Sequence, residues 1–128
     1  MVDFGQIPYD QGSGTIWHVN PTGRVERAVE ELTMPVDVTT GTAGELYVVE
    51  FSAFYNRRTD RFTPGTGRVV LARTEGARPM LNDLDFPTAI VRGADNNLYF
   101  TTHGAFSEPS SGGIWRVPAR TGFTDTTP

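Results

Sequence analysis

The segment Leu84-Asp85-Phe86-Pro87 repeats the segment Leu32-Thr33-Met34-Pro35, and Leu98-Tyr99 repeats Leu46-Tyr47. Both pairs are 52 residues apart, with no gap between them. A third recurring segment begins at Gly14, Gly67 and Gly113. A period near 50 residues, filled with short strands and Gly/Pro turns, is typical of β-propeller blades, so the sequence predicts an all-β fold.

The repeat divides the 128 residues into about 2.5 four-stranded antiparallel blades. Residues 32–83 are expected to form a full blade, and residues 1–31 and 84–128 two incomplete blades. Closed propellers have roughly four to eight blades. Because an open arc exposes a sheet face and unpaired edges, we expect a truncated propeller, or one that a protein partner or additional copies of the chain complete.

Runs of β-branched and aromatic residues, bounded by Gly, Pro, Asn and Asp, give the expected strands. Residues 24–34 are rich in Glu, which leaves a helix open there as the alternative to a strand. The expected strands cover residues 2–4, 15–20, 24–29, 36–40, 45–51, 68–73, 77–81, 88–92, 97–103 and 114–117, with a last outer strand or tail at 123–128.

The composition excludes several classes of function. The formal net charge is -4, which argues against nucleic acid as a partner, because phosphate binding needs concentrated positive charge. No stretch approaches the roughly 18 apolar residues of a membrane span. The chain has no Cys, which excludes disulfides, thiolate catalysis and Cys-based zinc sites.

The connections between the expected strands differ in length. In an up-and-down blade, the loops between the second and third strands all lie on one side of the disk. The long connections, residues 5–14, 52–66 and 104–112, are all of this kind. Long loops on a rigid scaffold commonly carry binding sites, so we expect the binding site on that side.

The longest of these loops combines arginines with aromatic residues. Planar guanidinium groups and flat rings together can bind an anionic partner, a carbohydrate or a protein. The alternative is a solvated loop whose aromatic rings fold back onto the sheet. The predicted binding residues are Phe54, Tyr55, Arg57, Arg58, Arg61 and Phe62.

A metal site is a second hypothesis. Asp37 begins an inner strand, near the expected opening of the central channel, and His103 is a plausible base at a strand end on the long-loop side. Asp3, Glu50 and Thr102 occupy equivalent strand ends, where a ring of oxygen ligands would suit a divalent cation such as calcium. The alternative metal ligands are therefore Asp37, Glu50 and His103, although each of them also suits a structural role.

The blade pattern resembles a known group of proteins. The segment from Pro87 to Tyr99, with its Asp/Gly turn before Leu98-Tyr99, is similar to NHL-type six-bladed propellers. The segments 46–52, 67–69 and 84–88 resemble the ScyD/ScyE family of bacterial propellers more specifically, in its C-terminal portion. That resemblance implies a periplasmic or extracellular protein and supplies no catalytic residues.

These observations predict a non-catalytic binding or assembly module without a cofactor. The alternative is a fragment of a metal-dependent propeller enzyme, whose site other blades would complete. The regucalcin-like lactonases and virginiamycin B lyase are similar propeller enzymes, which imply acidic or amide metal ligands at the channel opening and a His base, respectively. The alternative activity is therefore that of a lyase or a lactonase.

Overall fold

The computed structural model describes residues 1–74 and 76–119, and within them it is all β, without a helix. Glu75 in the expected turn at residues 74–76, and the last strand or tail expected at residues 123–128, lie outside the described residues. The described residues contain no helix that is long and apolar enough to cross a bilayer. This described part of the chain forms three antiparallel sheets and one small hairpin, and none of these sheets closes on itself.

The first sheet consists of β1 (Val2–Asp3), β2 (Gly14–Val19) and β3 (Val25–Leu32), hydrogen-bonded in that order. The Glu-rich segment is thus a strand, because β3 pairs with β2 along most of its length. It is an outer strand that is mostly exposed, which explains its many charged side chains.

The second sheet is the four-stranded one. It consists of β4 (Pro35–Thr40), β5 (Leu46–Glu50), β8 (Gly67–Arg73) and β9 (Gly76–Leu84), in the order β4-β5-β8-β9. The outer strand is longer than the expected segment at 77–81, since pairing continues to Gly67 and Leu84 through two register shifts.

The third sheet consists of β10 (Ile90–Arg92), β11 (Asn97–Thr102) and β12 (Gly113–Pro118), in the order β10-β11-β12. The antiparallel pair β10–β11 follows β4–β5 at the predicted interval. The expectation that residues 36–51 and 88–103 form successive antiparallel strand pairs is therefore confirmed.

The backbone repeats the same 52-residue period at its unusual conformations. Met34 and Phe86 have φ of 46° and 44°, and Glu31 and Asp83 have φ of 58° and 60°. These left-handed conformations disfavour ordinary L-residues, so their return at matching positions indicates the same corner built twice. The turn before Leu98 contains Asn96 at a φ of 61°, which matches Gly44 at 81° and fits the Asx turn expected there.

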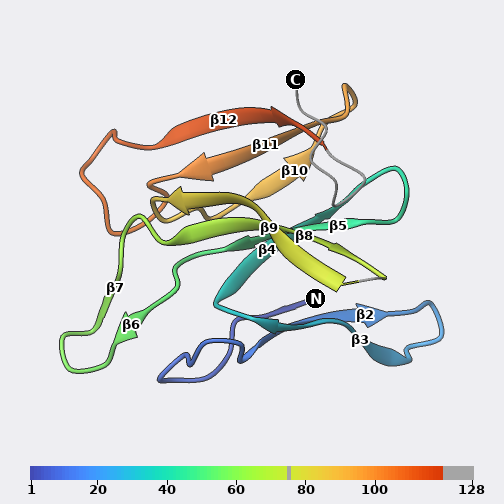
Figure 1. The fold of residues 1–128 in the computed structure, drawn as a ribbon, viewed down its shortest axis with the longest axis horizontal. Coiled ribbons are helices and arrows are strands. Elements are labelled where there is room, and N and C mark those ends of the chain that lie inside the picture. The colour runs from blue at the N-terminus through green and yellow to red at the C-terminus, as the bar shows by residue number, and fades with distance from the viewer. Residues whose placement is uncertain (75, 120–128) are drawn as a thin grey trace.

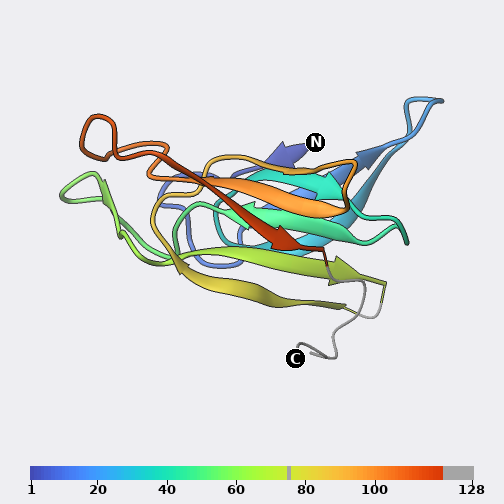
Figure 2. The same ribbon diagram turned by 90° about the horizontal axis from the view of Figure 1, so that it is seen from above.

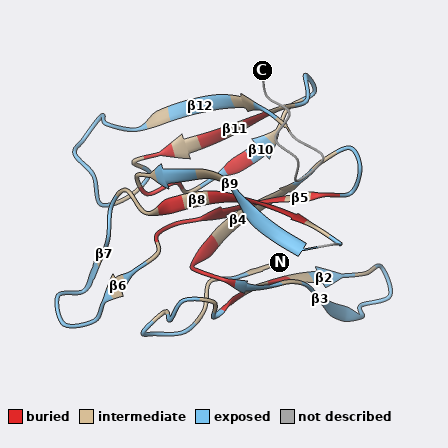
Figure 3. Ribbon diagram, in the orientation of Figure 1, coloured by how far each residue is buried: buried red, intermediate tan, exposed pale blue. Residues whose placement is uncertain are grey.

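The three sheets stack face to face in chain order (Figure 1). Figure 2 views the stack from above, so that the three sheets overlie one another. The middle sheet is the most buried, and the outer strands β3, β9 and β12 are largely exposed (Figure 3).

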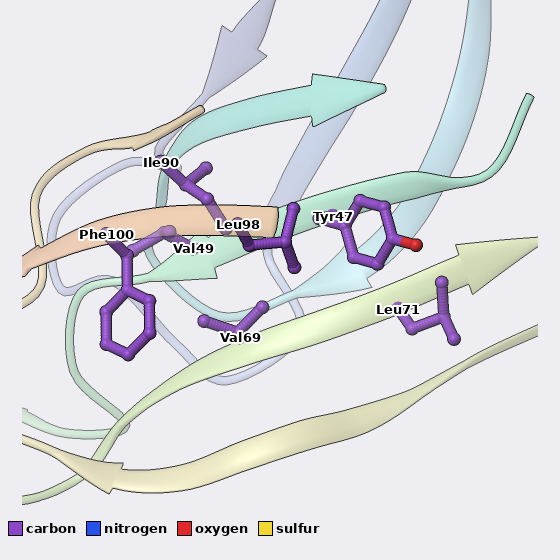
Figure 4. Close-up of a cluster of buried hydrophobic side chains, with 7 residues drawn as sticks. All are labelled: Tyr47, Val49, Val69, Leu71, Ile90, Leu98 and Phe100. Carbon is purple, nitrogen blue, oxygen red and sulfur yellow. The ribbon is translucent and has the colours of Figure 1, made fainter. Parts of the chain in front are cut away.

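Two apolar layers join the stack. Ile16 and Leu32 pack on Val48 and Val70, between the first and second sheets. Figure 4 shows the second layer, between the second and third sheets, where seven side chains meet. These are Tyr47, Val49, Val69, Leu71, Ile90, Leu98 and Phe100.

In the first two repeats, the glycine at the start of the third strand fits against the proline that begins the following repeat. A Cβ placed on Gly14 would lie 2.3 Å from Cδ of Pro35, and one on Gly67 would lie 2.5 Å from Cδ of Pro87. Pro35 and Pro87 are thus equivalent entry points. The strand register corrects one alignment: Thr102 pairs with Gly113 as Glu50 pairs with Arg68. The residue equivalent to Gly67 is therefore Gly112 rather than Gly113.

We expect Gly67→Ala to destabilise the chain by about 1–3 kcal/mol, because its methyl group would overlap the ring of Pro87 and the carbonyl oxygen of Glu50. The matched control is Gly112→Ala, whose Cβ would meet only the carbonyl oxygen of Thr102, at 3.9 Å. That control is expected to be neutral or slightly stabilising. Urea unfolding of both variants measures the difference, and equal stabilities would contradict the proposed contact.

Candidate binding face

All three long connections lie along the same side of the stacked sheets, opposite the tight turns (Figure 1). They are residues 4–13, 51–66 and 103–112, which we call the long-loop face. The tight turns on the opposite side join β2 to β3, β4 to β5 and β10 to β11. The predicted separation of long loops from tight turns is therefore present in the structure.

The longest connection is not an irregular loop, because it contains a small hairpin. Its strands are β6 (Tyr55–Asn56) and β7 (Arg61–Phe62), with Tyr55 opposite Phe62. The side chain of Asn56 closes the turn, where its Oδ1 accepts the backbone N–H of Arg58 at 2.9 Å. An Asx side chain that binds backbone N–H groups in this way is a common means of fixing a turn.

The base of the hairpin is fastened by hydroxyl groups. Ser52 Oγ donates to the carbonyl oxygen of Thr63 at 2.9 Å and lies 3.0 Å from Thr66 Oγ1. Thr66 Oγ1 also accepts the backbone N–H of Ala53 at 2.9 Å. Because these bonds join the two ends of the connection, the hairpin is held at a defined position above the sheet.

Aromatic rings join the three long connections and the corner at Phe86 into one cluster. Phe51 stacks on Phe86 at 5.0 Å between ring centroids, and Phe62 stacks on Phe106 at 5.6 Å. The ring of Phe62 also lies 5.3 Å from that of Phe51. The members of this aromatic cluster are Phe4, Tyr9, Phe51, Tyr55, Phe62, Phe86 and Phe106.

The six predicted binding residues divide into two groups. Tyr55 and Phe62 fold inward and form part of the aromatic cluster, as the alternative interpretation of the loop expected. Phe54, Arg57, Arg58 and Arg61 are exposed. The three arginine side chains form no ion pair with any residue in the ranges 1–74 and 76–119. The hairpin therefore presents three cations on a scaffold that its own aromatic side anchors.

Tyr55 is tied to the hairpin turn as well. Its hydroxyl donates to Asp60 Oδ1 at 2.5 Å, and this hydrogen bond raises the pKa of Tyr55 above its ordinary value. The bond joins the first strand of the hairpin to its turn, beside the exposed arginines.

Two adjoining hollows lie between the hairpin and residues 103–112. The first, about 410 Å³, is lined by Arg61, Phe62 and residues beside them. The second, about 540 Å³, is lined by Asp85, His103, Glu108 and neighbouring residues. Both share Pro64, Phe86 and Phe106 as a common floor. The result is one groove, with Asp60 and Arg61 on the hairpin side and Asp85 and Glu108 on the other side.

Sequence reasoning did not identify Phe86 and Phe106 as part of this face. Phe86 occupies the position of Met34 in the preceding repeat, which marks it as a packing residue rather than a site residue. Phe106 lies in a long connection whose sequence does not repeat that of residues 51–66, and it is largely exposed. An aromatic residue among Ser, Gly and Glu in the segment 104–112 was the available signal.

The three alternative metal ligands each make separate contacts. Asp37 Oδ2 accepts the backbone N–H of Ile90 at 2.8 Å, which links the inner strands of the second and third sheets. Glu50 accepts the backbone N–H of Thr33 at 2.6 Å and forms an ion pair with Arg68. His103 Nε2 lies 3.5 Å from Asp85 Oδ2.

The equivalent strand ends also bind local groups. Asp3 Oδ1 accepts the backbone N–H of Gly5 at 3.0 Å, and Thr102 Oγ1 accepts Trp115 Nε1–H at 2.9 Å. Within the described ranges, no three His, Asp or Glu side chains lie close enough to hold a metal ion. Each of these five residues contacts a nearby backbone or side-chain group in the described part of the chain.

Comparison with known proteins supplies no relative for this chain. No family model matches it, and neither a curated protein nor a solved structure does. The argument for function therefore depends on the long-loop face itself.

Proposed function

We propose that the chain is a binding and assembly module that binds a protein partner through its long-loop face. In this proposal the three sheets are blades of a β-propeller of the ScyD/ScyE type, which works outside the cytoplasm. Support for the blades comes from the 52-residue period, the recurring backbone conformations and the two Gly–Pro junctions. The exported location depends on the family resemblance alone.

One observation carries the proposal: the aromatic cluster anchors a hairpin whose other side presents three exposed arginines. Arg57, Arg58 and Arg61 lie within five residues of one another on this hairpin. Guanidinium groups bind carboxylates through two parallel hydrogen bonds and are enriched at energetically important positions of protein interfaces. The partner expected for this surface is a protein segment that combines carboxylates with an aromatic or aliphatic side chain.

The groove beside the hairpin fits the apolar part of such a segment. Its floor is aromatic, and Arg61 lies at its edge. An anchored hairpin loses little conformational entropy when a partner binds, because its backbone is already ordered. Asp85 and Glu108 on the opposite side would repel an acidic segment, so they favour a partner whose carboxylates lie over the hairpin.

Replacing Arg57, Arg58 and Arg61 together with Ala should weaken partner binding by about tenfold or more, since single arginine anchors commonly contribute about 1 kcal/mol or more each. The probe is the tightest peptide selected from a random displayed library with the chain as bait. Fluorescence anisotropy measures its affinity. Thermal unfolding should shift by only a few degrees, because the three side chains are exposed.

The matched control changes the net charge by the same amount elsewhere. Arg24, Arg27 and Arg116 are exposed residues on β-strands or turns outside the long-loop face. Replacing these three with Ala should leave the affinity within about twofold, as expected for remote charges at physiological salt. If both triple variants lose affinity equally, the effect is one of net charge and the hairpin is not the binding site.

A further inference from the structure

The middle sheet has two buried faces, and each contacts a different neighbour. The face toward the third sheet includes Tyr47, Val49 and Val69, which are completely buried by the side chains of β10 and β11 (Figure 4). The other face includes Val48 and Val70, which contact Ile16 of the first sheet. For every sheet, we call the face equivalent to that of Tyr47 and Val49 the forward face, and the face equivalent to that of Val48 and Val70 the back face.

Among residues 1–74 and 76–119, no sheet packs against the forward face of the third sheet. In strand register, Thr101 pairs with Ile114 as Val49 pairs with Val69, and Tyr99 pairs with Arg116 as Tyr47 pairs with Leu71. Ile114 is 76% exposed, whereas its equivalent Val69 is completely buried. Val91, on the same face of the neighbouring strand β10, is 57% exposed.

The back face of the first sheet is uncovered as well. Ile16 packs against the second sheet, and side chains alternate along a strand, so Trp17 and Val19 both lie on the opposite side of β2. Met1 exchanges two backbone hydrogen bonds with Trp17, and this pair occupies the register position of Val48 and Val70 in the second sheet. Val19 pairs with Val25, and both are about half exposed.

Each of the two junctions thus joins one forward face to one back face, and the described residues leave one free face of each kind. We propose that a second copy of this chain occupies the free forward face of the third sheet, with the back face of its first sheet. The contact would continue the stacking pattern already used twice within the chain. The contact uses the outer faces of the first and third sheets and not the long-loop face, so its failure can be distinguished from a failure of partner binding.

A contact between two different faces is heterologous, and it therefore generates rings or open chains of copies rather than symmetric pairs. Exposed apolar side chains supply the driving force at both faces, with Ile114 and Val91 on one and Val19 and Val25 on the other. The heterologous contact distinguishes the proposal from non-specific association, because blocking either face alone should abolish association between copies.

The experiment uses two double variants and sedimentation equilibrium at concentrations up to about 1 mM, which detects weak association. Val91→Lys with Ile114→Lys blocks the forward face, and Val19→Lys with Val25→Lys blocks the back face. The unmodified chain should show an average mass that rises with concentration above the monomer mass of 14.0 kDa. Each double variant alone should remain a monomer.

The decisive sample is the equimolar mixture of the two double variants. Each variant keeps one working face, so the mixture should form dimers of twice the monomer mass and nothing larger. The control, Ile7→Lys with Ala43→Lys, adds the same charge at exposed positions outside both faces and should associate like the unmodified chain. Circular dichroism of all variants verifies that they remain folded.

Three results would overturn the proposal. The first is an unmodified chain that stays monomeric over the whole range, which leaves both faces for other occupants. The second is a single double variant that still forms dimers, which indicates a symmetric contact instead. The third is a mixture that fails to associate although both variants are folded.

Discussion

Leu98→Ala should lower the free energy of unfolding by about 3 kcal/mol, within the 2–5 kcal/mol typical of a buried Leu-to-Ala change. Leu98 is completely buried in the layer that joins the second and third sheets. The third sheet has only three strands in the described residues, and this layer is its main attachment to the rest of the chain. Urea unfolding, followed by circular dichroism, measures the change.

The matched control is Ile114→Ala, a similar loss of volume on the other face of the same sheet. Because Ile114 is largely exposed, its truncation should change stability by less than about 0.5 kcal/mol in dilute solution. If Ile114→Ala were as costly as Leu98→Ala, the free forward face would already be covered in the monomer. That outcome would contradict the burial on which the head-to-tail proposal depends.

Arg68→Met should destabilise the chain by about 3 kcal/mol, because it leaves the carboxylate of Glu50 buried without its cation. The side chain of Glu50 is only 2% exposed, and that of Arg68 is 37% exposed. Arg68 Nε donates to Glu50 Oε1 at 2.6 Å. The partial exposure of Arg68 places the expected cost at the lower end of the 3–5 kcal/mol range for breaking buried pairs.

Two further variants test the cause. The double variant Glu50→Gln with Arg68→Met removes the buried charge and should recover part of the lost stability, which a double-mutant cycle detects as coupling. Arg24→Met breaks the exposed pair with Glu26 and should cost less than about 1 kcal/mol. If Arg68→Met were as mild as Arg24→Met, Glu50 would be hydrated rather than buried.

The repeat made the sheets predictable. Each of the expected strands before residue 120 coincides with an observed one, to within a few residues at its ends. The reason is that β-branched and aromatic runs were bounded by Gly, Pro and Asx turns at a fixed period. The offset at Gly113 was an error of one residue, because the third repeat has two adjacent glycines and only strand pairing shows which one matches Gly67.

The site was less predictable, because it depends on which side chains of the hairpin pack inward and which stay exposed. Tyr55, Phe62 and Phe54 are all aromatic, yet the hairpin directs Tyr55 and Phe62 inward and leaves Phe54 exposed. The groove also combines Arg61 with Phe86 and Phe106, which come from other segments. No spacing in the sequence indicates that contact, since aromatic packing between loops has no period.

The central claim is that the long-loop face is the binding face, and amide chemical-shift mapping tests it most directly. The peptide selected from the displayed library is titrated into the isotope-labelled chain, and shift changes are assigned residue by residue. The account predicts the largest changes at residues 54–64 and 103–111, on the hairpin and beside the groove. Changes concentrated at the tight turns around residues 20–24, 41–44 and 93–96, with the hairpin unaffected, would contradict it.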